Sequence, residues 1–564
     1  MNAPWANPYK PSMGLHILKQ SLKADFEITI DYANLLFYNI LPDFITLSIL
    51  HNHFWDNPCL FWLSEGLFAP YAYYDDAVRS ECVNNYWNTI NSIISNGVDK
   101  SVYPRALVEW LGENKTHLSD FMLNTIPSYL KLTAQNYKSI INDDDILGFS
   151  CFFNQTFPSL AIAKALRDEG VNNPIIFGGA SLTNENAPVL LKYFKQIDYV
   201  VPGEGEIPLY KLLSYLTNHT DINSIQDICY FRGNDKSIIH SNNAVHSNEQ
   251  SVNYLTNLDD LPVIDYSDYL KSINKCSIDN LAVSHIPFET TRGCYWFSAG
   301  KCSFCGLMDN NSVRSKSVDN VYKEIVEQFE LYNPDYFECA DAALPIHQIR
   351  KLIPKLVAFF QKKEKKIKFF FEVRPNIQKK DICNFSQLGD VTLQGGIESF
   401  STNFLKHLNK GIDALTNVQF IKWCSLYGVN NFYNLLFNHP GETKKDYTDS
   451  ADLIQKIAHL QPPSSVMKVM ALENSPIYRN PEAYGITNMK PWPVYNTLIP
   501  NFTDNDKHAF AYYFDFDYTP GIPNSQHYHN MLINAVTIWR NSYANKDYFL
   551  IMKMYIPAKP ATQS

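Results

Sequence analysis

Short apolar runs alternate with longer amphipathic segments in two separate parts of the chain. In the first part, the strand-like runs and the helix-like segments are 146–153, 158–169, 174–177, 187–195 and 198–201. Strands that are buried on both faces read as continuous apolar runs, whereas helices show a 3.6-residue period. The pattern therefore predicts βαβ units with a parallel sheet, followed by an Asn- and Ser-rich loop or hairpin at 232–257.

A second alternating series begins near Phe288. Its expected strands are Tyr336–Cys339, Lys368–Val373, Val391–Gln394, Asn431–Phe437 and Ser465–Leu472. Its expected helices lie between these strands, at 319–332, 346–363, 413–427 and 446–458. Five or six βα units in about 190 residues favour a full or partial barrel over an open sheet.

The two series define the expected domain organisation. The predicted regions are a helical and loop region at 1–140, an α/β domain at 141–257, a barrel at 258–500 and a C-terminal extension at 501–564. The most apolar stretch, Leu35 to Leu50, contains polar residues and a proline, so nothing reaches the roughly 20 apolar residues that span a bilayer. The first residues also lack the basic and apolar regions of a secretory signal. We therefore expect a soluble cytoplasmic protein.

Composition and charge narrow the classes of partner. The 564 residues include 48 basic and 57 acidic side chains, which gives a formal net charge of −9. Such a chain has no whole-molecule attraction to nucleic acid or to anionic lipid, so we expect neither as a partner. Aromatic residues make up 14% of the chain, and this excess is compatible with a large core.

The 11 cysteines fall into a scattered group and a clustered group. The scattered ones are best interpreted as isolated thiols: Cys59, Cys82, Cys151, Cys229, Cys276, Cys339, Cys383 and Cys424. The clustered ones, Cys294, Cys302 and Cys305, have the spacing Cys-x7-Cys-x2-Cys just after the first strand of the second series. In a cytosolic chain this spacing indicates metal or redox chemistry rather than a disulfide framework.

Two kinds of metal centre compete for the clustered cysteines. Three thiolates can hold three irons of a [4Fe–4S] cluster and leave the fourth iron open to a substrate atom. A structural zinc site instead needs four ligands that close a tetrahedron. The nearest histidine, His285, lies nine residues before Cys294, and none follows closely. The residues therefore favour the open cluster over zinc.

Further short motifs accompany the cysteines. They are Arg292-Gly293-Cys294-Tyr295-Trp296, Cys302-Ser303-Phe304-Cys305-Gly306-Leu307, Arg314-Ser315-Lys316-Ser317, Gly395-Gly396-Ile397-Glu398-Ser399, Leu408-Asn409-Lys410-Gly411, Pro440-Gly441-Glu442-Thr443 and His459-Leu460-Gln461-Pro462-Pro463. Together they resemble the cobalamin-binding radical S-adenosylmethionine (radical SAM) enzymes that mature ribosomally made peptides, many of them C-methyltransferases. The resemblance runs from Pro4 to about Phe516. It implies an α/β fold, in which a Rossmann-like cobalamin-binding domain precedes a partial (β/α)6 radical SAM barrel, with N- and C-terminal extensions.

The resemblance assigns the cofactors of the barrel to particular residues. Cys294, Cys302 and Cys305 would ligate a [4Fe–4S] cluster, and S-adenosylmethionine would chelate its fourth iron. Polar residues at strand ends would bind the rest of S-adenosylmethionine: Glu338, Asp341, Glu372, Arg374 and Glu398. An ordinary strand-end salt bridge is an equal alternative for each of these polar residues.

For the upstream domain, the resemblance implies a cobalamin site. Its expected contacts are Asn154 and Gln155 near the lower face of cobalt, Gly178 and Gly179 beside the nucleotide tail, and Gly203 and Glu204 in the next loop. The chain lacks an Asp-x-His-x-x-Gly motif, so we expect no histidine as the lower axial ligand. The alternative is a Rossmann-like domain that has lost its cofactor.

The function implied by the resemblance is methylation of an unactivated carbon of a precursor peptide, with methylcobalamin as the methyl donor. A reductant such as flavodoxin or ferredoxin would be a further partner. The alternatives are peptide crosslinking, epimerisation or cyclisation without methyl transfer, and action on a small natural-product precursor. A non-catalytic peptide carrier would not need the three clustered cysteines.

Several strand-end segments depart from the family pattern. They are Gln394-Gly395-Gly396-Ile397-Glu398, Tyr433-Asn434-Leu435-Leu436-Phe437-Asn438-His439-Pro440-Gly441-Glu442 and Leu472-Glu473-Asn474-Ser475-Pro476. They leave the cluster chemistry intact and the reaction outcome open. His439 is a proton donor, a cofactor contact or a packed loop histidine, and the aromatic C-terminal segments at 512–517 and 527–529 form a cavity lid, a partner surface or part of the core.

Overall fold

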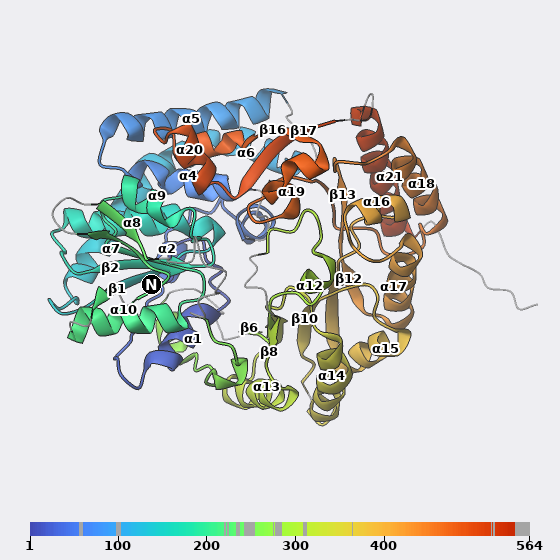
Figure 1. Ribbon diagram of the computed structural model, residues 1–564, viewed down its shortest axis with the longest axis horizontal. Helices are drawn as coiled ribbons and strands as arrows, with labels where there is room; N and C mark the ends of the chain where they lie inside the picture. The colour runs from blue at the N-terminus through green and yellow to red at the C-terminus, as the bar shows by residue number, and fades with distance from the viewer. Residues whose placement is uncertain are drawn as a thin grey trace, which may run out of the picture.

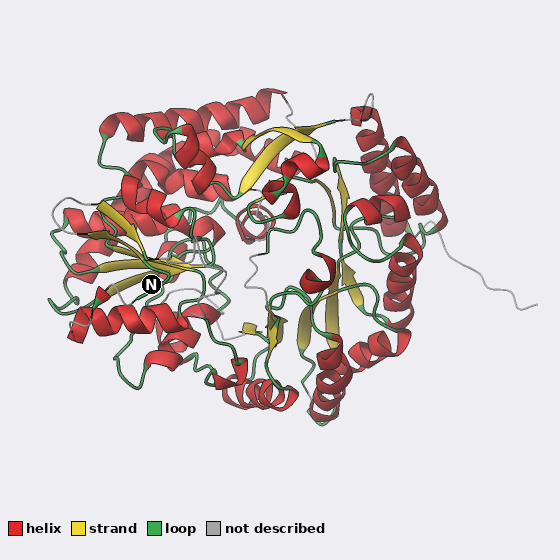
Figure 2. Cartoon of the chain, in the orientation of Figure 1, coloured by secondary structure: helices red, strands yellow, loops and turns green. Residues whose placement is uncertain are grey.

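Two α/β units lie side by side in the computed structural model, and N-terminal helices cover the upper edge of the first unit (Figure 1). The structure describes residues 1–55, 60–96, 103–218, 221–222, 225–232, 237–241, 254–274, 276, 285–307, 313–363, 365–519, 522 and 525–546. In the second unit the helices lie on the outer side of the sheet, so the inner face of that sheet is turned toward the first unit (Figure 2). This arrangement leaves the strand ends of both units near the middle of the molecule.

The N-terminal region is helical and encloses an aromatic core. Its helices are α1 (Met13–Leu22), α2 (Ala33–Tyr38), α3 (Leu47–Ile49), α4 (Phe61–Ala72), α5 (Asp76–Asn96), α6 (Arg105–Asp120) and α7 (Ile126–Lys138), with π-helical turns at Leu50–Trp55 and Phe121–Thr125. Helix α4 is buried on almost every side, as expected for a helix that is apolar all round. Trp5 stacks on Phe54 with ring centroids 4.8 Å apart. Many of the aromatic residues of this region therefore serve core packing.

The first unit contains the predicted parallel strands. Its sheet has the order β1-β2-β3-β4-β5, formed by β1 (Leu147–Ser150), β2 (Ile175–Gly179), β3 (Tyr199–Pro202) and the antiparallel hairpin of β4 (Cys229–Arg232) and β5 (Ser237–His240). The connecting helices are α8 (Thr156–Asp168), α9 (Ala187–Tyr193) and α10 (Glu206–Asn218). The expected strand at 146–153 ends early, because the chain turns after Ser150 into a 3-10 helix at Phe153–Gln155. Residues 233–236 and 242–253 of the predicted loop or hairpin lie outside the described residues.

The second unit contains a parallel sheet in the order β12-β11-β10-β9-β6. Its strands are β6 (His285–Phe288), β9 (Tyr336–Cys339), β10 (Lys368–Val373), β11 (Asp390–Gly395) and β12 (Asn430–Phe432). A separate parallel pair, β13 (Asn434–Phe437) and β14 (Ser465–Lys468), joins this sheet through a bridge between Glu398 and Leu435. The α/β class with parallel sheets is thereby confirmed.

Two expected strands of the second unit are wrong in detail. The expected strand at 431–437 breaks at Tyr433, a fully buried residue whose hydroxyl donates to the carbonyl of Gln461. The expected strand at 465–472 ends at Lys468, and its last residues form β15 (Ala471–Leu472), which pairs antiparallel with β17 (Tyr513–Tyr518). Strand β15 thus leaves the parallel series for a sheet in the order β15-β17-β16, where β16 is Ile486–Pro491.

Amphipathic helices cover the outer side of the second unit. They are α13 (Val318–Tyr332), α14 (Ile346–Phe360), α15 (Lys379–Leu388), α16 (Thr402–His407), α17 (Ala414–Tyr427) and α18 (Lys444–Lys456). In α14 the buried residues Ile349, Ile353 and Phe360 recur at the spacing of a single helix face. The short helices α15 and α16 lie outside the segments that the sequence pattern predicts.

The remaining elements connect and close the two units. They are α11 (Ser267–Ile273), β7 (Thr291–Arg292), α12 (Phe297–Gly300), β8 (Arg314–Ser315), α19 (Pro476–Arg479), α20 (Asp504–Phe510), α21 (Ser525–Asn545) and 3-10 turns at Leu258–Asp260, Pro481–Tyr484 and Pro493–Thr497. The buried carboxylate of Glu442 accepts hydrogen bonds from Tyr447 of α18 and Tyr518 of β17 and lies 3.1 Å from His529 of α21. The 527–529 segment, for which core packing is one of the alternatives, has His529 buried.

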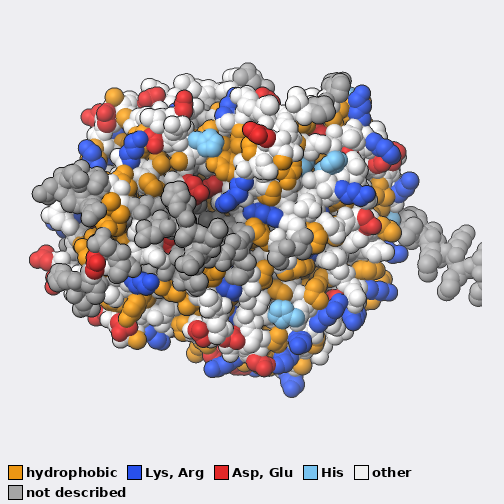
Figure 3. All heavy atoms as spheres, viewed as in Figure 1, with side chains coloured by type: hydrophobic (Ala, Val, Ile, Leu, Met, Phe, Trp, Pro, Cys, Tyr) orange, Lys and Arg blue, Asp and Glu red, His pale blue; other side chains and the backbone are white. Residues whose placement is uncertain are grey.

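Membrane and surface features add little to this picture. No helix in the described ranges combines the length and apolar character required to cross a bilayer. On the face shown in Figure 3, acidic and basic side chains are interspersed rather than gathered into a field of one sign.

Candidate active site

A cavity of about 2500 Å³ lies between the two units. The first unit lines it with residues 150–157, 178–184 and 201–206, which follow β1, β2 and β3. The second unit lines it with residues 291–294 and with the inner face of its sheet, including Glu338. Parallel sheets bind ligands at the carboxyl ends of their strands, and ordinary ligand pockets measure about 300–1,000 Å³. The position and size of this cavity therefore suit more than one ligand.

The cysteine loop, residues 294–305, borders this cavity. Cys294 lies two residues after the end of β7 and lines the cavity wall, while Cys302 and Cys305 lie beyond the short helix α12. All three thiols are half-buried. Burial raises the pKa of Cys302 and of Cys305. Cys294 also contributes to the raised pKa of Cys302, and both Cys302 and Cys294 contribute to the raised pKa of Cys305. The three predicted ligands thus lie on one loop, and this loop reaches the cavity at Cys294.

The segment 408–411 holds the cysteine loop in place. The indole of Trp296 donates to the carbonyl of Asn409 at 2.8 Å, and the side-chain amide of Asn409 donates to the carbonyl of Gly300 at 2.7 Å. Gly411 has a φ of 63°, and a Cβ there would lie 2.1 Å from the ring of Trp296. Glycine is required at this position because both the backbone conformation and the close contact exclude a side chain.

His439 is a packed loop histidine that supports the cysteine loop. Its side chain is fully buried, and burial lowers its pKa to about 4. Its Nδ1 lies 2.6 Å from the carbonyl oxygen of Pro440, which only accepts, so Nδ1 carries the proton and Nε2 accepts from the hydroxyl of Ser303 at 2.7 Å. Ser303 lies between Cys302 and Cys305 in the sequence, so its hydrogen bond to His439 holds the cysteine loop in place.

Two of the predicted S-adenosylmethionine ligands have different environments. Glu338 lines the cavity, where its carboxylate accepts from Lys10 at 2.6 Å and lies 2.5 Å from His285. Burial opposes its ionisation, but His285 and Lys10 outweigh burial and hold its pKa at about 2. Asp341 is buried and accepts from the backbone of Thr290 and Thr291, which places it in the frame of the loop. Burial raises the pKa of Asp341 to about 6.

Glu372, Arg374 and Glu398 converge at the strand ends of β10 and β11. Burial, followed by the neighbouring carboxylates of Glu398, Glu338 and Asp341, raises the pKa of Glu372 to about 7. Arg374 donates to the carbonyl of Lys410 and lies over the ring of Trp296 at 4.3 Å. Glu398 pairs with the ammonium of Lys410 at 3.1 Å. The Nε of Arg374 is buried with no protein partner among the described residues, so one donor remains for a ligand.

The glycine residues of the first unit form a backbone edge of the cavity. Gly179 has a φ of 112°, and a Cβ there would lie 2.5 Å from the carbonyl oxygen of Cys151. Gly203 has a φ of 76° and faces open space, and Gly178 also lines the cavity. Gly203 leaves room for a ligand beside the main chain, as the predicted cobalamin site requires, whereas Gly179 is required by the contact of its own main chain with Cys151.

Asn154 and Gln155 line the same cavity but use their amide nitrogens inside the protein. Asn154 donates to the carbonyl of Phe54 at 2.5 Å. Gln155 donates to the side chain of Asn2 at 2.9 Å and to the carbonyl of Ala3 at 3.1 Å. These bonds tie the turn after β1 to the N-terminal region, which is a structural use that the sequence did not reveal.

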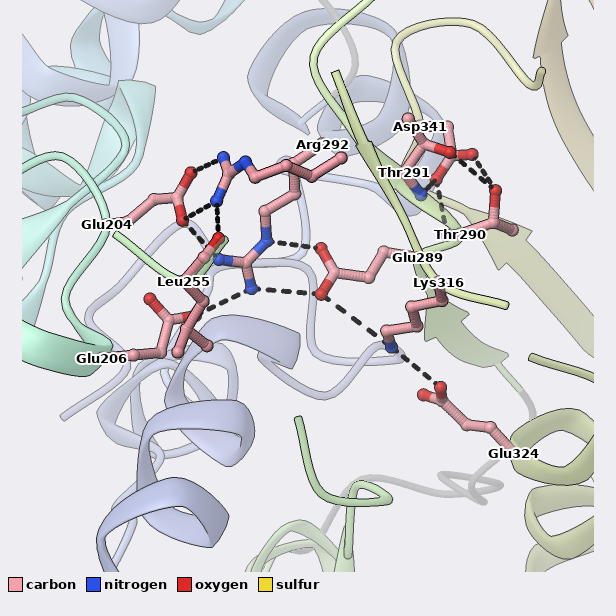
Figure 4. Close-up of polar contacts among 11 residues, drawn as sticks. Glu204, Glu206, Leu255, Glu289, Thr290, Thr291, Arg292, Lys316, Glu324 and Asp341 are labelled. Atoms are coloured by element: carbon pink, nitrogen blue, oxygen red, sulfur yellow. Dashed lines mark hydrogen bonds and ion pairs between the residues drawn. The ribbon is translucent and has the colours of Figure 1, made fainter. Parts of the chain in front are cut away.

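Glu204 contacts the second unit rather than standing alone in its loop. Its carboxylate accepts from Arg292 at 2.8 Å and from Arg314, two residues on adjacent short strands (Figure 4). Burial opposes ionisation, but Arg314 and Arg292 outweigh it, and the pKa of Glu204 lies below its ordinary value. Both arginines lie in motifs that the sequence singles out, yet their partner is not visible from the sequence.

Lys10 has no signal in the sequence, and Glu473 stands out there only as part of the strand-end segment 472–476. Lys10 comes from the N-terminal region and reaches the inner face of the second sheet. Glu473 is buried in the cavity wall and accepts from Thr183 at 2.9 Å, and burial followed by the neighbouring Glu185 raises its pKa to about 7. These contacts join residues that are distant in the chain, so no local pattern marks them.

The donor set fits an iron–sulfur cluster better than a single metal ion. Across the described part of the chain, no three His, Cys, Asp or Glu side chains are grouped so that they could hold one metal ion. In a cluster each thiolate binds a different iron, so the three sulfurs need not meet at one point. Three half-buried thiols beside a large cavity match that requirement.

Comparisons with known proteins show what the chain resembles. No protein-family model matches it. It is 23% identical to an uncharacterised methyltransferase of Pyrococcus horikoshii over 58% of this chain and 68% of that protein. A shorter stretch, 14% of this chain and 15% of the relative, is 38% identical to the anaerobic magnesium-protoporphyrin IX monomethyl ester cyclase of Synechocystis.

Solved structures establish the fold. The cobalamin-dependent S-adenosylmethionine radical enzyme OxsB, with aqua-cobalamin and S-adenosylmethionine bound, is matched at 18% identity over 73% of this chain with a TM-score of 0.53. The chain spans 60% of the length of OxsB. The radical S-adenosylmethionine methyltransferase TsrM of Kitasatospora setae, with cobalamin and a [4Fe-4S] cluster bound, is matched at 15% identity over 77% of this chain and 84% of TsrM, with a TM-score of 0.51. The chain therefore has the fold of cobalamin-dependent radical SAM enzymes.

Proposed function

We propose that this protein is a cobalamin-dependent radical SAM enzyme that methylates an unactivated carbon of a ribosomally made precursor peptide. The observation that carries the proposal is the single cavity that borders both the cysteine loop and the glycine edge of the first unit. Cluster chemistry and methyl transfer require two cofactors that face a common space. The shared fold with OxsB and TsrM supports the same assignment.

The cysteine loop and the glycine edge would hold the cofactors. Cys294, Cys302 and Cys305 would hold a [4Fe–4S] cluster, and the backbone at Gly179 and Gly203 would lie against cobalamin. When bound, the cluster and S-adenosylmethionine supply a 5′-deoxyadenosyl radical and methylcobalamin supplies the methyl group.

The side chains at the strand ends would orient S-adenosylmethionine. The stacked guanidinium of Arg374 offers its buried Nε to a carboxylate, and Lys410 fixes the neighbouring Glu398. Glu372, whose pKa is raised to about 7, carries a proton in a substantial fraction of molecules near pH 7, and the protonated form can donate a hydrogen bond as well as accept one. The carboxylate of Glu338 is already balanced by Lys10, so a ligand ammonium there would replace the Lys10 contact.

The cavity walls would protect the reaction from water. Phe152 and Phe432 are large exposed side chains, and both line the cavity. Their apolar surface becomes covered when ligands fill the space, and this excludes solvent from the reacting atoms. The volume beyond one cofactor is compatible with a peptide segment, which is the substrate that we propose.

Anaerobic reconstitution of the full chain with iron and sulfide tests the proposal. We expect about four irons per chain, bound cobalamin, 5′-deoxyadenosine formation and a precursor peptide heavier by one methylene when flavodoxin supplies electrons. Cys294→Ala, Cys302→Ala and Cys305→Ala should each lower 5′-deoxyadenosine formation more than about 100-fold. Cys383→Ala, at a half-buried scattered cysteine, is the matched control and should retain it.

The possible products separate the alternatives. A peptide of unchanged mass would indicate epimerisation instead of methylation. A peptide that has lost hydrogen would indicate crosslinking or cyclisation. Methylation of a small natural-product precursor with no reaction on peptides would overturn the peptide part alone. Full 5′-deoxyadenosine formation in the three cysteine variants would overturn the entire assignment.

A further inference from the structure

Arg292 joins the cysteine loop to the first unit. It lies two residues before Cys294, and its guanidinium contacts Glu204 at 2.8 Å and Glu206 at 2.7 Å. Its Nε donates to Glu289 at 3.0 Å, on the barrel side. A single side chain therefore bridges carboxylates from both units, as Figure 4 shows.

Arg314 provides a second link between the two units, through the same carboxylate of Glu204. It lies opposite Arg292 in the antiparallel pair of β7 and β8, and its guanidinium donates to both carboxylate oxygens of Glu204. It also lies over the ring of Tyr254 at 4.5 Å. Glu204 is thus held between two planar guanidinium groups, a geometry that fixes direction as well as distance.

The barrel end of this inter-unit ion network is anchored in the fold. Glu289 lies 3.9 Å from Lys316, and Lys316 pairs with Glu324 of α13 at 2.9 Å. The side chains of Arg314, Lys316, Glu289 and Glu324 are all at least nine-tenths buried. Buried ion pairs contribute little net stability, because desolvation offsets their attraction, but they favour one particular geometry. This network is therefore better suited to fixing an orientation than to stabilising the fold.

Both ends of the bridge lie in the cavity wall. Residues 203–206 line the cavity from the first unit and residues 291–294 line it from the second. We propose that Glu204 is a positioning residue that sets the separation between the cobalamin edge of the first unit and the cysteine loop, and so couples radical formation to methyl transfer. This inference rests on the proposed function for its chemistry, while its structural part stands on the ion network alone.

Hydrogen exchange tests the structural part without any cofactor. Glu204→Gln keeps the shape of the side chain and removes its charge. We expect exchange to rise roughly fivefold in both 199–206 and 289–294, while β13 is unchanged. Glu324→Gln is the matched control, because it removes a buried carboxylate of the same network that does not cross between the units, and it should leave 199–206 unchanged. A rise in only one of the two segments, or in neither, would overturn the proposal.

Product ratios and magnetic resonance test the chemical part in the reconstituted enzyme. In Glu204→Gln, we expect iron content and 5′-deoxyadenosine formation within about twofold of the parent but about tenfold less methylated product per 5′-deoxyadenosine. The magnetic interaction between the reduced cluster and cob(II)alamin should weaken, and Arg314→Lys should retain more of it than Arg314→Gln. An unchanged product ratio or an unchanged interaction would overturn the coupling role. A parent enzyme that forms no methylated product would instead contradict the proposed function and leave the exchange result to decide the structural part.

Discussion

The two sides of the cavity differ in which atoms they present: one side presents ionisable side chains and the other presents main chain. The side formed by the second unit presents ionisable side chains, including Glu338 and the thiol of Cys294. The side of the first unit presents main chain at Gly179 and Gly203, while its polar side chains bond elsewhere in the protein. The function of a side that performs chemistry depends on the type of each residue. The function of a side that fits a ligand depends on the conformation of the main chain. The two sides should therefore respond to different substitutions.

The substitution with the largest expected effect on stability and on cobalamin binding lies in the first unit, where main chain forms the cavity wall. Gly179→Ala should lower the free energy of unfolding by about 3–5 kcal/mol and abolish cobalamin binding, because strain at positive φ adds to a clash with Cys151. Thermal unfolding and cobalamin retention measure the two effects. Gly170→Ala is the control, since Gly170 has a similar φ of 86° with open space around it, and it should cost only about 1 kcal/mol. Equal losses in the two variants would contradict the close-approach argument.

Two carboxyls in the cavity wall should give opposite pH dependences. The folded pKa of Glu473 is raised to about 7 from 4.5, so its contribution is present below pH 4.5 and is lost as the pH rises through about 7. The folded pKa of Glu338 is lowered to about 2, so its contribution is present above pH 4.5 and is lost as the pH falls through about 2. Each effect is about 3 kcal/mol in free energy of unfolding.

Unfolding free energies across pH, measured for Glu473→Gln and Glu338→Gln, check these signs. Relative to the parent, Glu473→Gln should gain stability between pH 4.5 and 7, and Glu338→Gln should lose its dependence between pH 4.5 and 2. Differences of the same sign in the two variants would show that the carboxyls share one environment.

Support of the cysteine loop from behind is expected to have a smaller effect. Ser303→Ala leaves the buried Nε2 of His439 without its donor, which should cost about 1–3 kcal/mol and reduce iron retention after reconstitution. Iron content and thermal unfolding are the measurements. Ser386→Ala is a suitable control, because that hydroxyl bonds within its own helix turn. Unchanged iron retention in Ser303→Ala would show that His439 does not support the cysteine loop.

The smallest effect is expected at Asn154. Asn154→Ala removes one buried hydrogen bond to Phe54, so we expect a loss of about 1–2 kcal/mol with little change in cobalamin affinity. Cobalamin titration checks this result. A large loss of affinity with stability preserved would place Asn154 on the cofactor and would weaken the contrast between the two sides.

The features that the sequence predicted best are those for which the chemistry requires a particular residue type at a particular spacing. Cys294, Cys302 and Cys305 stand out because cluster chemistry demands thiols at short spacing, and Cys294 lines the cavity. The βαβ alternation was visible because buried parallel strands are continuously apolar. Short helices such as α15, and the change of partner after Lys468, depend on tertiary packing and left no periodic signal.

Side-chain partners were the least predictable part of the site. Glu204 lies 88 residues from Arg292 and 110 from Arg314 along the chain, so no local pattern joins them. His439 carries three possible roles in the sequence, and only its bonds to Ser303 and Pro440 select one. Residue type alone limits what a side chain can do, whereas its neighbours decide which of those roles it has.

The bonds of Glu442 also bear on the order in which the chain assembles. Its partners Tyr518 and His529 follow it by 76 and 87 residues, so they leave the ribosome well after the strands of the second sheet. Until they arrive, the carboxylate has only its local contacts, and α21 does not cover α18. Closing such distant contacts is slow. We therefore expect the second unit to reach its full stability only after His529 has been translated, and a nascent chain stalled before Tyr518 should remain sensitive to protease in this unit.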